Sequence, residues 1–146
     1  MDRVHVRFVR MLVLVTAVVA GARTADAQEL LDRILARVDG ATITLTDVHA
    51  AIAVGLVTPA AGDEPVTAGL RQLIDRQLIG AEVQRFPPPE PAADAIDREA
   101  ARLAAHAAGG LGEVERSTGL TPQRLRLLAR ENLRTAGYLD QRFGTA

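Results

Sequence analysis

The sequence has few side chains suited to nucleophilic or acid–base catalysis. After residue 27 it contains one serine, Ser117, no cysteine, and two histidines, His49 and His106. A hydrolase or transferase needs a nucleophile, a base and a group that orients the base, all within hydrogen-bonding reach. Ser117 lies in an Arg-Ser-Thr-Gly segment, which is typical of the polar end of a helix. We therefore expect no catalytic residues and no enzyme activity.

Metal and cofactor chemistry has equally little support. His49 and His106 have no second histidine at helical spacing and no carboxylates at ligand spacing. A group of three carboxylates, Asp94, Asp97 and Glu99, resembles a paired-carboxylate site only superficially. It falls at the expected start of a helix, where negative charge interacts favourably with the helix dipole. We expect no bound metal and no cofactor.

Three arginines at four-residue spacing, Arg126, Arg130 and Arg134, raise the question of nucleic-acid binding. A helix of this kind after a glycine-containing turn has the appearance of a helix-turn-helix recognition helix. However, the chain has 17 basic and 18 acidic residues and a formal net charge of −1, and Glu131 lies beside the arginines. Nucleic-acid-binding domains carry excess positive charge. We interpret the stripe as a solvated face with intrahelical ion pairs, and we expect no nucleic-acid partner.

Residues 1–27 have the features of a secretory signal peptide. Arg3, Arg7 and Arg10 precede an uncharged run at 11–22, and small residues follow at 25 and 27. The run is too short for a membrane anchor, which needs about 20 apolar residues. The sequence has no cysteine, which excludes disulfides and a lipid-attachment site. We expect cleavage after Ala27, or else near Ala22, and a single periplasmic domain at 28–146 that does not insert stably into the membrane.

The exported part begins with the pattern of a β-hairpin. Two short runs, at 34–38 and 41–43, flank Asp39-Gly40, a pair that favours a type I′ turn because both central residues need positive φ. Thr44 or Thr46 then offers an N-cap for a helix at 46–56 that exposes His49.

Helical periodicity dominates the rest of the chain. After a Pro- and Gly-containing loop at 58–65, the apolar spacing predicts helices at 66–85, 92–108 and 122–143, with a short helical turn at 111–117. Phe86 and three prolines end the first of these, Gly119 follows the turn, and Thr121-Pro122 starts the last. We predict a mostly α domain in which a short β-hairpin precedes a small bundle of four to five helices.

Three stretches, in this order and spacing, resemble the N-terminal domain of SurA-type periplasmic chaperones. The similarity covers nearly all of residues 32–143, although Asp39 stands where the family usually has asparagine. The stretches are ILARVDG (34–40) with ITLTDV (43–48), LRQLIDRQLI (70–79) with Ala81-Glu82, and GLTPQRL (119–125) with RENL (130–133) and QRF (141–143).

The resemblance implies a SurA N-terminal or trigger-factor C-terminal-like fold and an ATP-independent chaperone that binds unfolded exported proteins, including outer-membrane proteins. Family members usually continue into a parvulin isomerase domain, which we expect to be absent after residue 146, so isomerase activity is not carried over. A C-terminal segment of full-length relatives packs on this domain. Without it, a hydrophobic groove would be open, filled by a second copy, or closed by local rearrangement.

Two alternatives remain at this stage. One is a non-catalytic subunit that forms a homodimer or works with a separate isomerase, and the other is a truncated peptidyl-prolyl isomerase. For the chaperone, we expect apolar positions to divide between the core and a client-binding surface. We place Tyr138 and Phe143 on the client-binding surface, followed by Leu128 and Leu125. The full set of positions considered is Leu73, Leu78, Leu125, Leu128, Tyr138 and Phe143.

Overall fold

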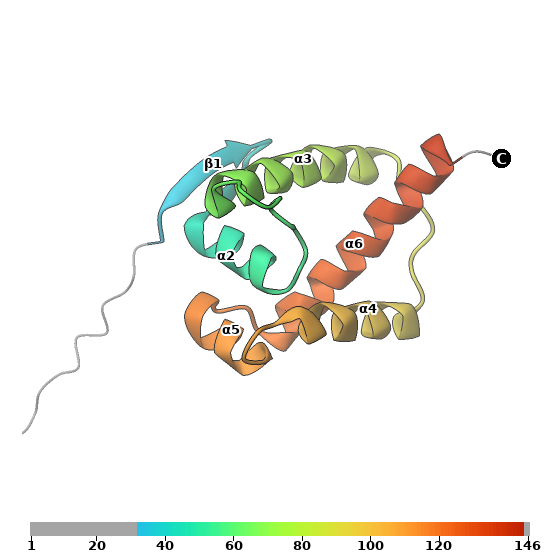
Figure 1. The fold of residues 1–146 in the computed structure, drawn as a ribbon. Helices are drawn as coiled ribbons and strands as arrows, with labels where there is room; N and C mark the ends of the chain where they lie inside the picture. The colour runs from blue at the N-terminus through green and yellow to red at the C-terminus, as the bar shows by residue number, and fades with distance from the viewer. Residues whose placement is uncertain (1–31, 145–146) are drawn as a thin grey trace, which may run out of the picture. The chain divides into compact units, whose positions relative to one another are not determined.

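The computed structural model describes residues 32–144, and they begin with the expected hairpin (Figure 1). Strand β1 (Ile34–Val38) pairs antiparallel with β2 (Ala41–Thr44), with an irregularity in register between Ile34 and Ala36. Asp39 and Gly40 have φ angles of 48° and 80°, which confirms the predicted turn with two positive φ values. The predicted signal peptide, residues 1–27, lies outside the described residues.

Helix α2 (Leu45–Ala53) begins directly after β2. The hydroxyl of Thr44 accepts a hydrogen bond from the backbone N–H of Asp47 at 3.2 Å, and the Asp47 carboxylate accepts one from the backbone N–H of Thr44 at 3.0 Å. Thr44 is therefore the cap, and this reciprocal pair is a capping box. The predicted helix end at Leu56 is wrong, because Gly55 has a φ of +65° and the chain turns there.

Helix α3 (Pro65–Arg85) begins and ends close to the predicted bounds. Its N-cap is Glu64, whose carboxylate accepts hydrogen bonds from the backbone N–H groups of Val66 and Thr67 at 3.1 and 2.7 Å. The sequence reasoning had placed Glu64 in the loop. The helix ends before Phe86, which precedes a proline and leaves the helical region.

The remaining helices are α4 (Ala93–His106), α5 (Leu111–Thr118) and α6 (Pro122–Phe143). α4 ends two residues before the predicted end at Ala108. The predicted short turn is instead an eight-residue helix, which ends at Gly119 with a φ of 68°. Thr121 caps α6 by accepting a hydrogen bond from the backbone N–H of Arg124 at 3.2 Å, as the sequence predicts.

The helices are arranged so that α6 runs obliquely between α3 and α4 (Figure 1). The main core joins α2, α4, α5 and α6, and it contains Val54 and Leu103, both 0% exposed. Burying a side chain of this size contributes about 1.5–3 kcal/mol. The architecture confirms the predicted mostly α fold with a hairpin followed by five helices.

Within residues 32–144, no helix is both long enough and apolar enough to cross a membrane.

Candidate functional site

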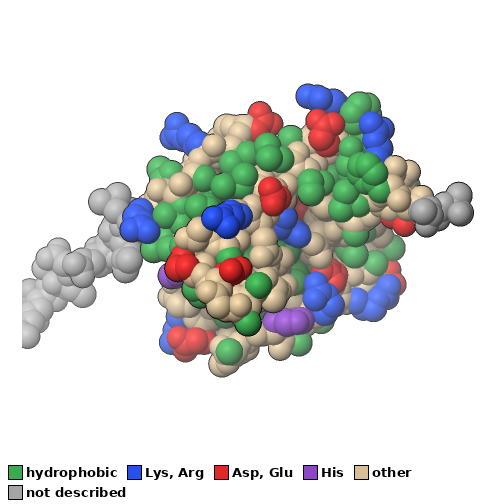
Figure 2. Space-filling model, turned by 45° about the horizontal axis from the view of Figure 1, so that its top comes forward, with side chains coloured by type: hydrophobic (Ala, Val, Ile, Leu, Met, Phe, Trp, Pro, Cys, Tyr) green, Lys and Arg blue, Asp and Glu red, His purple; other side chains and the backbone are tan. Residues whose placement is uncertain are grey.

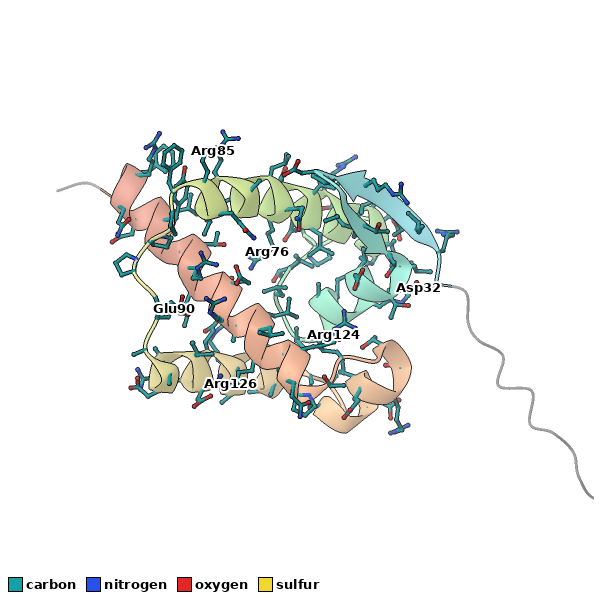
Figure 3. All side chains as sticks on the ribbon, turned by 180° about the vertical axis from the view of Figure 1, so that it is seen from behind. Asp32, Arg76, Arg85, Glu90, Arg124 and Arg126 are labelled. Carbon is teal, nitrogen blue, oxygen red and sulfur yellow. The ribbon has the colours of Figure 1, made fainter. Side chains whose placement is uncertain are left out.

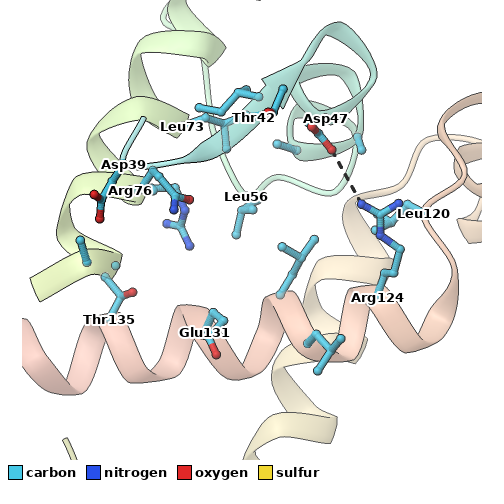
Figure 4. A pocket seen from close by; sticks show the side chains of 18 of the residues that line it. Asp39, Thr42, Asp47, Leu56, Leu73, Arg76, Leu120, Arg124, Glu131 and Thr135 are labelled. Atoms are coloured by element: carbon cyan, nitrogen blue, oxygen red, sulfur yellow. Dashed lines mark ion pairs between the residues drawn. The ribbon is translucent and has the colours of Figure 1, made fainter. Parts of the chain in front are cut away.

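A cavity of about 710 Å³ opens between two walls of the domain, and we call it the cleft (Figure 4). One wall comes from the hairpin, α2, the loop after α2, and α3. The other comes from α6 and the turn between α5 and α6. The cleft therefore lies where α6 leaves the main core and faces α3.

The α6 wall is one longitudinal stripe of the helix. Leu127, Leu128, Glu131 and Thr135 line the cleft, and their spacing of three and four residues places them on one side of a helix. Leu127 is 60% exposed. A leucine exposed to this extent beside a cavity is available to a ligand without any change in the core.

The opposite wall is also partly apolar. Leu56 and Leu73 line it, and Gly80 adds no side chain. A Cβ atom at Gly80 would have no heavy atom within 4 Å, so this part of α3 borders open space.

An ion pair crosses the cleft at the end nearest the start of α6. The guanidinium of Arg124 lies 3.8 Å from the carboxylate of Asp47 on α2 (Figure 4). The two side chains are 61% and 40% exposed, so the pair contributes at most about 1 kcal/mol. It nevertheless neutralises two charges at the cleft surface.

Arg76 of α3 lies between α3 and α6 and extends into the cleft (Figures 3 and 4). Its Nη2 donates to Oδ1 of Asn132 on α6 at 2.7 Å, and Nδ2 of Asn132 donates to Glu99 on α4 at 2.6 Å. Burial lowers the pKa of the Arg76 guanidinium, and attraction to Glu99 opposes this effect. A chain of polar contacts therefore connects α3, α6 and α4 at the cleft.

Glu99 is the anionic end of this chain. It accepts hydrogen bonds from Nε and Nη2 of Arg102 at 2.7 and 2.6 Å. These bonds are the main reason that the pKa of Glu99 is lowered. The hydrogen bond from Asn132 and the positive charges of Arg102 and Arg76 lower it further, whereas desolvation raises it. Glu99 is therefore held ionised beside Asn132.

The four predicted client-binding residues occupy different environments. Leu125 is 2% exposed and Tyr138 8%, so both are buried, whereas Leu128 lines the cleft and is partly buried. The predictions that Leu125 and Tyr138 lie on an accessible surface are wrong. Leu125 belongs to the main core. Tyr138 is covered as well. It follows Arg134 by one helical turn, and the Arg134 side chain is only 13% exposed, so this side of α6 is covered.

Phe143 is 72% exposed and does not line the cleft. It ends α6 next to Arg142, whose guanidinium lies 5.6 Å from the ring centroid of Phe86 in a cation–π arrangement. Phe86 is 50% exposed and Leu139 36%. Hydrophobic side chains gather beside this end of the described chain, with charged side chains around them (Figure 2). We call Phe86, Leu139 and Phe143 the aromatic corner.

The arginine stripe of α6 pairs mainly with other segments. Nε of Arg126 lies 2.6 Å from a carboxylate oxygen of Asp97 on α4, and Nη2 of Arg130 donates to Glu90 at 2.8 Å. Arg130 also pairs with Glu131 within α6 at 3.0 Å, and Glu131 is the ion-pair partner of Arg134 as well. The predicted intrahelical pairs are therefore present at Arg130 and Arg134, whereas Arg126 pairs with α4 and Arg130 pairs in addition with the loop before α4.

The residues considered for catalysis and metal binding have ordinary surroundings. Ser117 donates its hydroxyl to the backbone carbonyls of Glu113 and Val114 at 2.9 and 3.2 Å, and His49 and His106 are exposed. Among residues 32–144 no group of three or more histidine, aspartate and glutamate side chains is placed to hold a metal ion.

Sequence reasoning missed several cleft residues, notably Leu56, Arg76, Leu127 and Glu131. The helical spacing of the α6 residues was readable from the sequence, but nothing in the sequence says which of its apolar faces is covered. Comparisons with protein-family models, with curated proteins and with solved structures found no match to this chain.

Proposed function

We propose that this protein is an ATP-independent periplasmic chaperone or assembly factor that binds unfolded exported polypeptides, including outer-membrane proteins, in the cleft. The observation that carries the proposal is the open, partly apolar cleft, with Leu127 60% exposed at its wall. The resemblance of three sequence stretches to SurA-type chaperones supports the same assignment. The signal-peptide pattern of residues 1–27 supports a periplasmic location.

The energetics of such a surface suit reversible capture. Each leucine side chain removed fully from water contributes about 1.5–3 kcal/mol, and association and ordering of the client offset part of that gain. The cleft offers Leu56, Leu73, Leu127 and Leu128, each already partly covered or shared with the core. Contacts of this number favour weak binding that releases a client without nucleotide hydrolysis.

The test is whether the purified protein slows aggregation of an unfolded outer-membrane protein at a near-equimolar ratio. We expect suppression by the wild type and reduced suppression by Leu127→Ser, because this change removes apolar surface from the cleft. Leu78→Ser is the matched control, since Leu78 is 52% exposed on α3 but does not line the cleft. No suppression by a wild-type protein with an intact circular dichroism spectrum would refute the chaperone function.

A second candidate is a non-catalytic interaction subunit that works with itself or with a separate isomerase. The aromatic corner favours it, because Phe143 and Phe86 expose large apolar side chains outside the cleft. Light scattering of the purified protein distinguishes the two candidates. A tight dimer that Phe143→Ser dissociates, without suppression of aggregation, supports the interaction subunit.

A further inference from the structure

One cation in the wall of the cleft, Arg76, makes no direct ion pair among the described residues. Three arginines of residues 32–144 are partly buried, Arg76, Arg130 and Arg134, and of these only Arg76 makes no ion pair. Arg124, on the facing wall, is paired with Asp47. Glu99 attracts Arg76 but is connected to it only through Asn132, so a carboxylate in direct contact would offset more of the cost of desolvating the guanidinium.

The guanidinium of Arg76 is nevertheless held in place. Asn132 donates its amide N–H to Glu99, so its Oδ1 is the atom that faces Arg76 and accepts from Nη2. Arg76 has five N–H groups, and this contact uses one of them. The other nitrogens of Arg76 are not among the buried unpaired atoms of the described residues, and the residue lines the cleft.

The surroundings of this cation define what can reach it. Leu73 lies one helical turn before Arg76 on the same wall, and Leu128 is on the facing wall. A ligand that places a carboxylate on Arg76 can therefore also bring apolar groups against a leucine of each wall.

The remaining charges of the cleft work against strongly acidic ligands. Glu131 is paired with Arg130 and Arg134, and the Asp47 charge is matched by Arg124. Asp39, at the hairpin turn, makes no ion pair among the described residues and would repel further negative charge. The arrangement suits one carboxylate among apolar side chains.

We propose, building on the chaperone function above, that the cleft selects polypeptide segments in which a single glutamate or aspartate side chain is flanked by apolar residues. Arg76 binds the carboxylate through the N–H groups that face the cleft, in the two-point geometry that guanidinium and carboxylate favour. Leucines of both walls cover the flanking residues. The selectivity is thus a property of one preorganised guanidinium in a mostly neutral cleft.

Synthetic peptides with both ends blocked provide the test. Two labelled apolar peptides differ only in a central glutamate or glutamine, and fluorescence anisotropy measures their affinity for the purified protein. We expect the glutamate peptide to bind about tenfold more tightly, which is the effect of one charge-assisted hydrogen-bonded contact. Equal affinities would overturn the proposal while leaving chaperone activity intact, whereas failure of both peptides to bind would count against the chaperone function as well.

A third peptide keeps the central glutamine and carries a free C-terminal carboxylate. If it alone binds tightly, the cleft recognises chain ends, and selection of side-chain carboxylates is overturned. We expect it to bind like the blocked glutamine peptide.

Variants assign the selectivity to Arg76. In Arg76→Gln the glutamate preference should disappear, while Arg71→Gln should retain it, because Arg71 is exposed on the same helix and does not line the cleft. A preference that persists in folded Arg76→Gln overturns the assignment.

If circular dichroism shows that Arg76→Gln is unfolded, Arg76→Lys replaces it and should weaken the preference, because an ammonium group cannot make the two-point contact. An unchanged preference in Arg76→Lys would likewise contradict the role of the guanidinium.

Discussion

The two faces of α6 are both leucine-bearing, but they have opposite surroundings. On one face Leu125 and Ala129 are 2% and 0% exposed and belong to the main core with α4. On the other face Leu127, 60% exposed, lines the cleft together with Glu131 and Thr135. One face stabilises the domain, and the other leaves apolar surface in contact with water.

The stability of the domain and its proposed binding activity therefore depend on different residues of the same helix. A buried leucine stabilises the folded domain because its apolar surface is already removed from water. An exposed leucine can provide this free energy only when a ligand covers it. Substitutions on the two faces should therefore separate the two properties.

Truncating a leucine on each face tests the contrast directly. Leu125→Ala should lower the free energy of unfolding by about 2–5 kcal/mol, because it leaves a cavity in the core. Leu127→Ala should change it by no more than about 0.5 kcal/mol, because that side chain is mostly exposed. Urea denaturation followed by circular dichroism measures both values, and equal losses would show that the α6 wall of the cleft is closed in solution.

Asn132 connects the two sides of the helix through its bonds to Arg76 and Glu99. Asn132→Leu should lower the free energy of unfolding by about 1–3 kcal/mol, because two partly buried charged groups each lose a hydrogen-bonding partner. Gln123→Leu, at an exposed position of α6, is the control and should have little effect. If the two variants are equally stable, the polar chain does not hold α3 to α6 and α4.

The stability should also depend on pH through Glu99. Its pKa is lowered from an ordinary value of 4.5, mainly by the hydrogen bonds from Arg102. The stability that ionised Glu99 adds to the folded domain is therefore fully present above the unfolded-state pKa, and it is lost as the pH falls through the lower folded-state pKa. The urea midpoint of the wild type should therefore fall as the pH is lowered from neutral to below 4.5, and in Glu99→Gln this fall should be smaller.

Asp94→Asn is the control for this pH experiment. The carboxylate of Asp94 pairs with Arg98, but the two side chains are 69% and 71% exposed, so solvent screens their interaction. If Asp94→Asn reduces the fall of the urea midpoint at low pH as much as Glu99→Gln does, the contacts of Glu99 have no special role in this pH dependence.

The smallest effect is expected where α6 meets α4 at the surface. Arg126→Gln removes the ion pair with Asp97, whose side chains are 50% and 61% exposed, and should cost at most about 1 kcal/mol. Added salt should reduce the difference from the wild type. Thermal unfolding at low and high ionic strength measures it, and a large salt-independent loss would mean that Arg126 contributes through packing.

Much of the fold could be predicted because its signals are local. Asp39-Gly40 specified the turn, and Thr121-Pro122 specified the start of α6, since both effects act within a few residues. The end of α2 differs from the prediction although Gly55, with a φ of +65°, is itself a local signal for a helix end. Tertiary packing adds a second reason for glycine at this position. A Cβ atom there would lie 2.8 Å from Cδ2 of His106, at the far end of α4.

The candidate site was less predictable than the fold. Leu128, predicted on a client-binding surface, lines the cleft, whereas Leu125 and Tyr138, predicted on the same surface, are buried. Leu127 was not considered, although it follows the helical spacing of the cleft stripe. Apolar periodicity identifies a helix, but on a helix with more than one apolar face it does not distinguish the covered face from the open one.

By itself, the amino-acid sequence determined the order of the elements, the Asp39-Gly40 turn, the capped start of α6 and the mostly α class, because those features follow from interactions between near neighbours. Only the tertiary structure decided that α6 runs between α3 and α4, that Leu125 and Tyr138 are buried, and that Leu127 and Arg76 share an open cleft. These outcomes depend on how segments distant in the sequence meet, since a side chain becomes core or surface only through what packs against it.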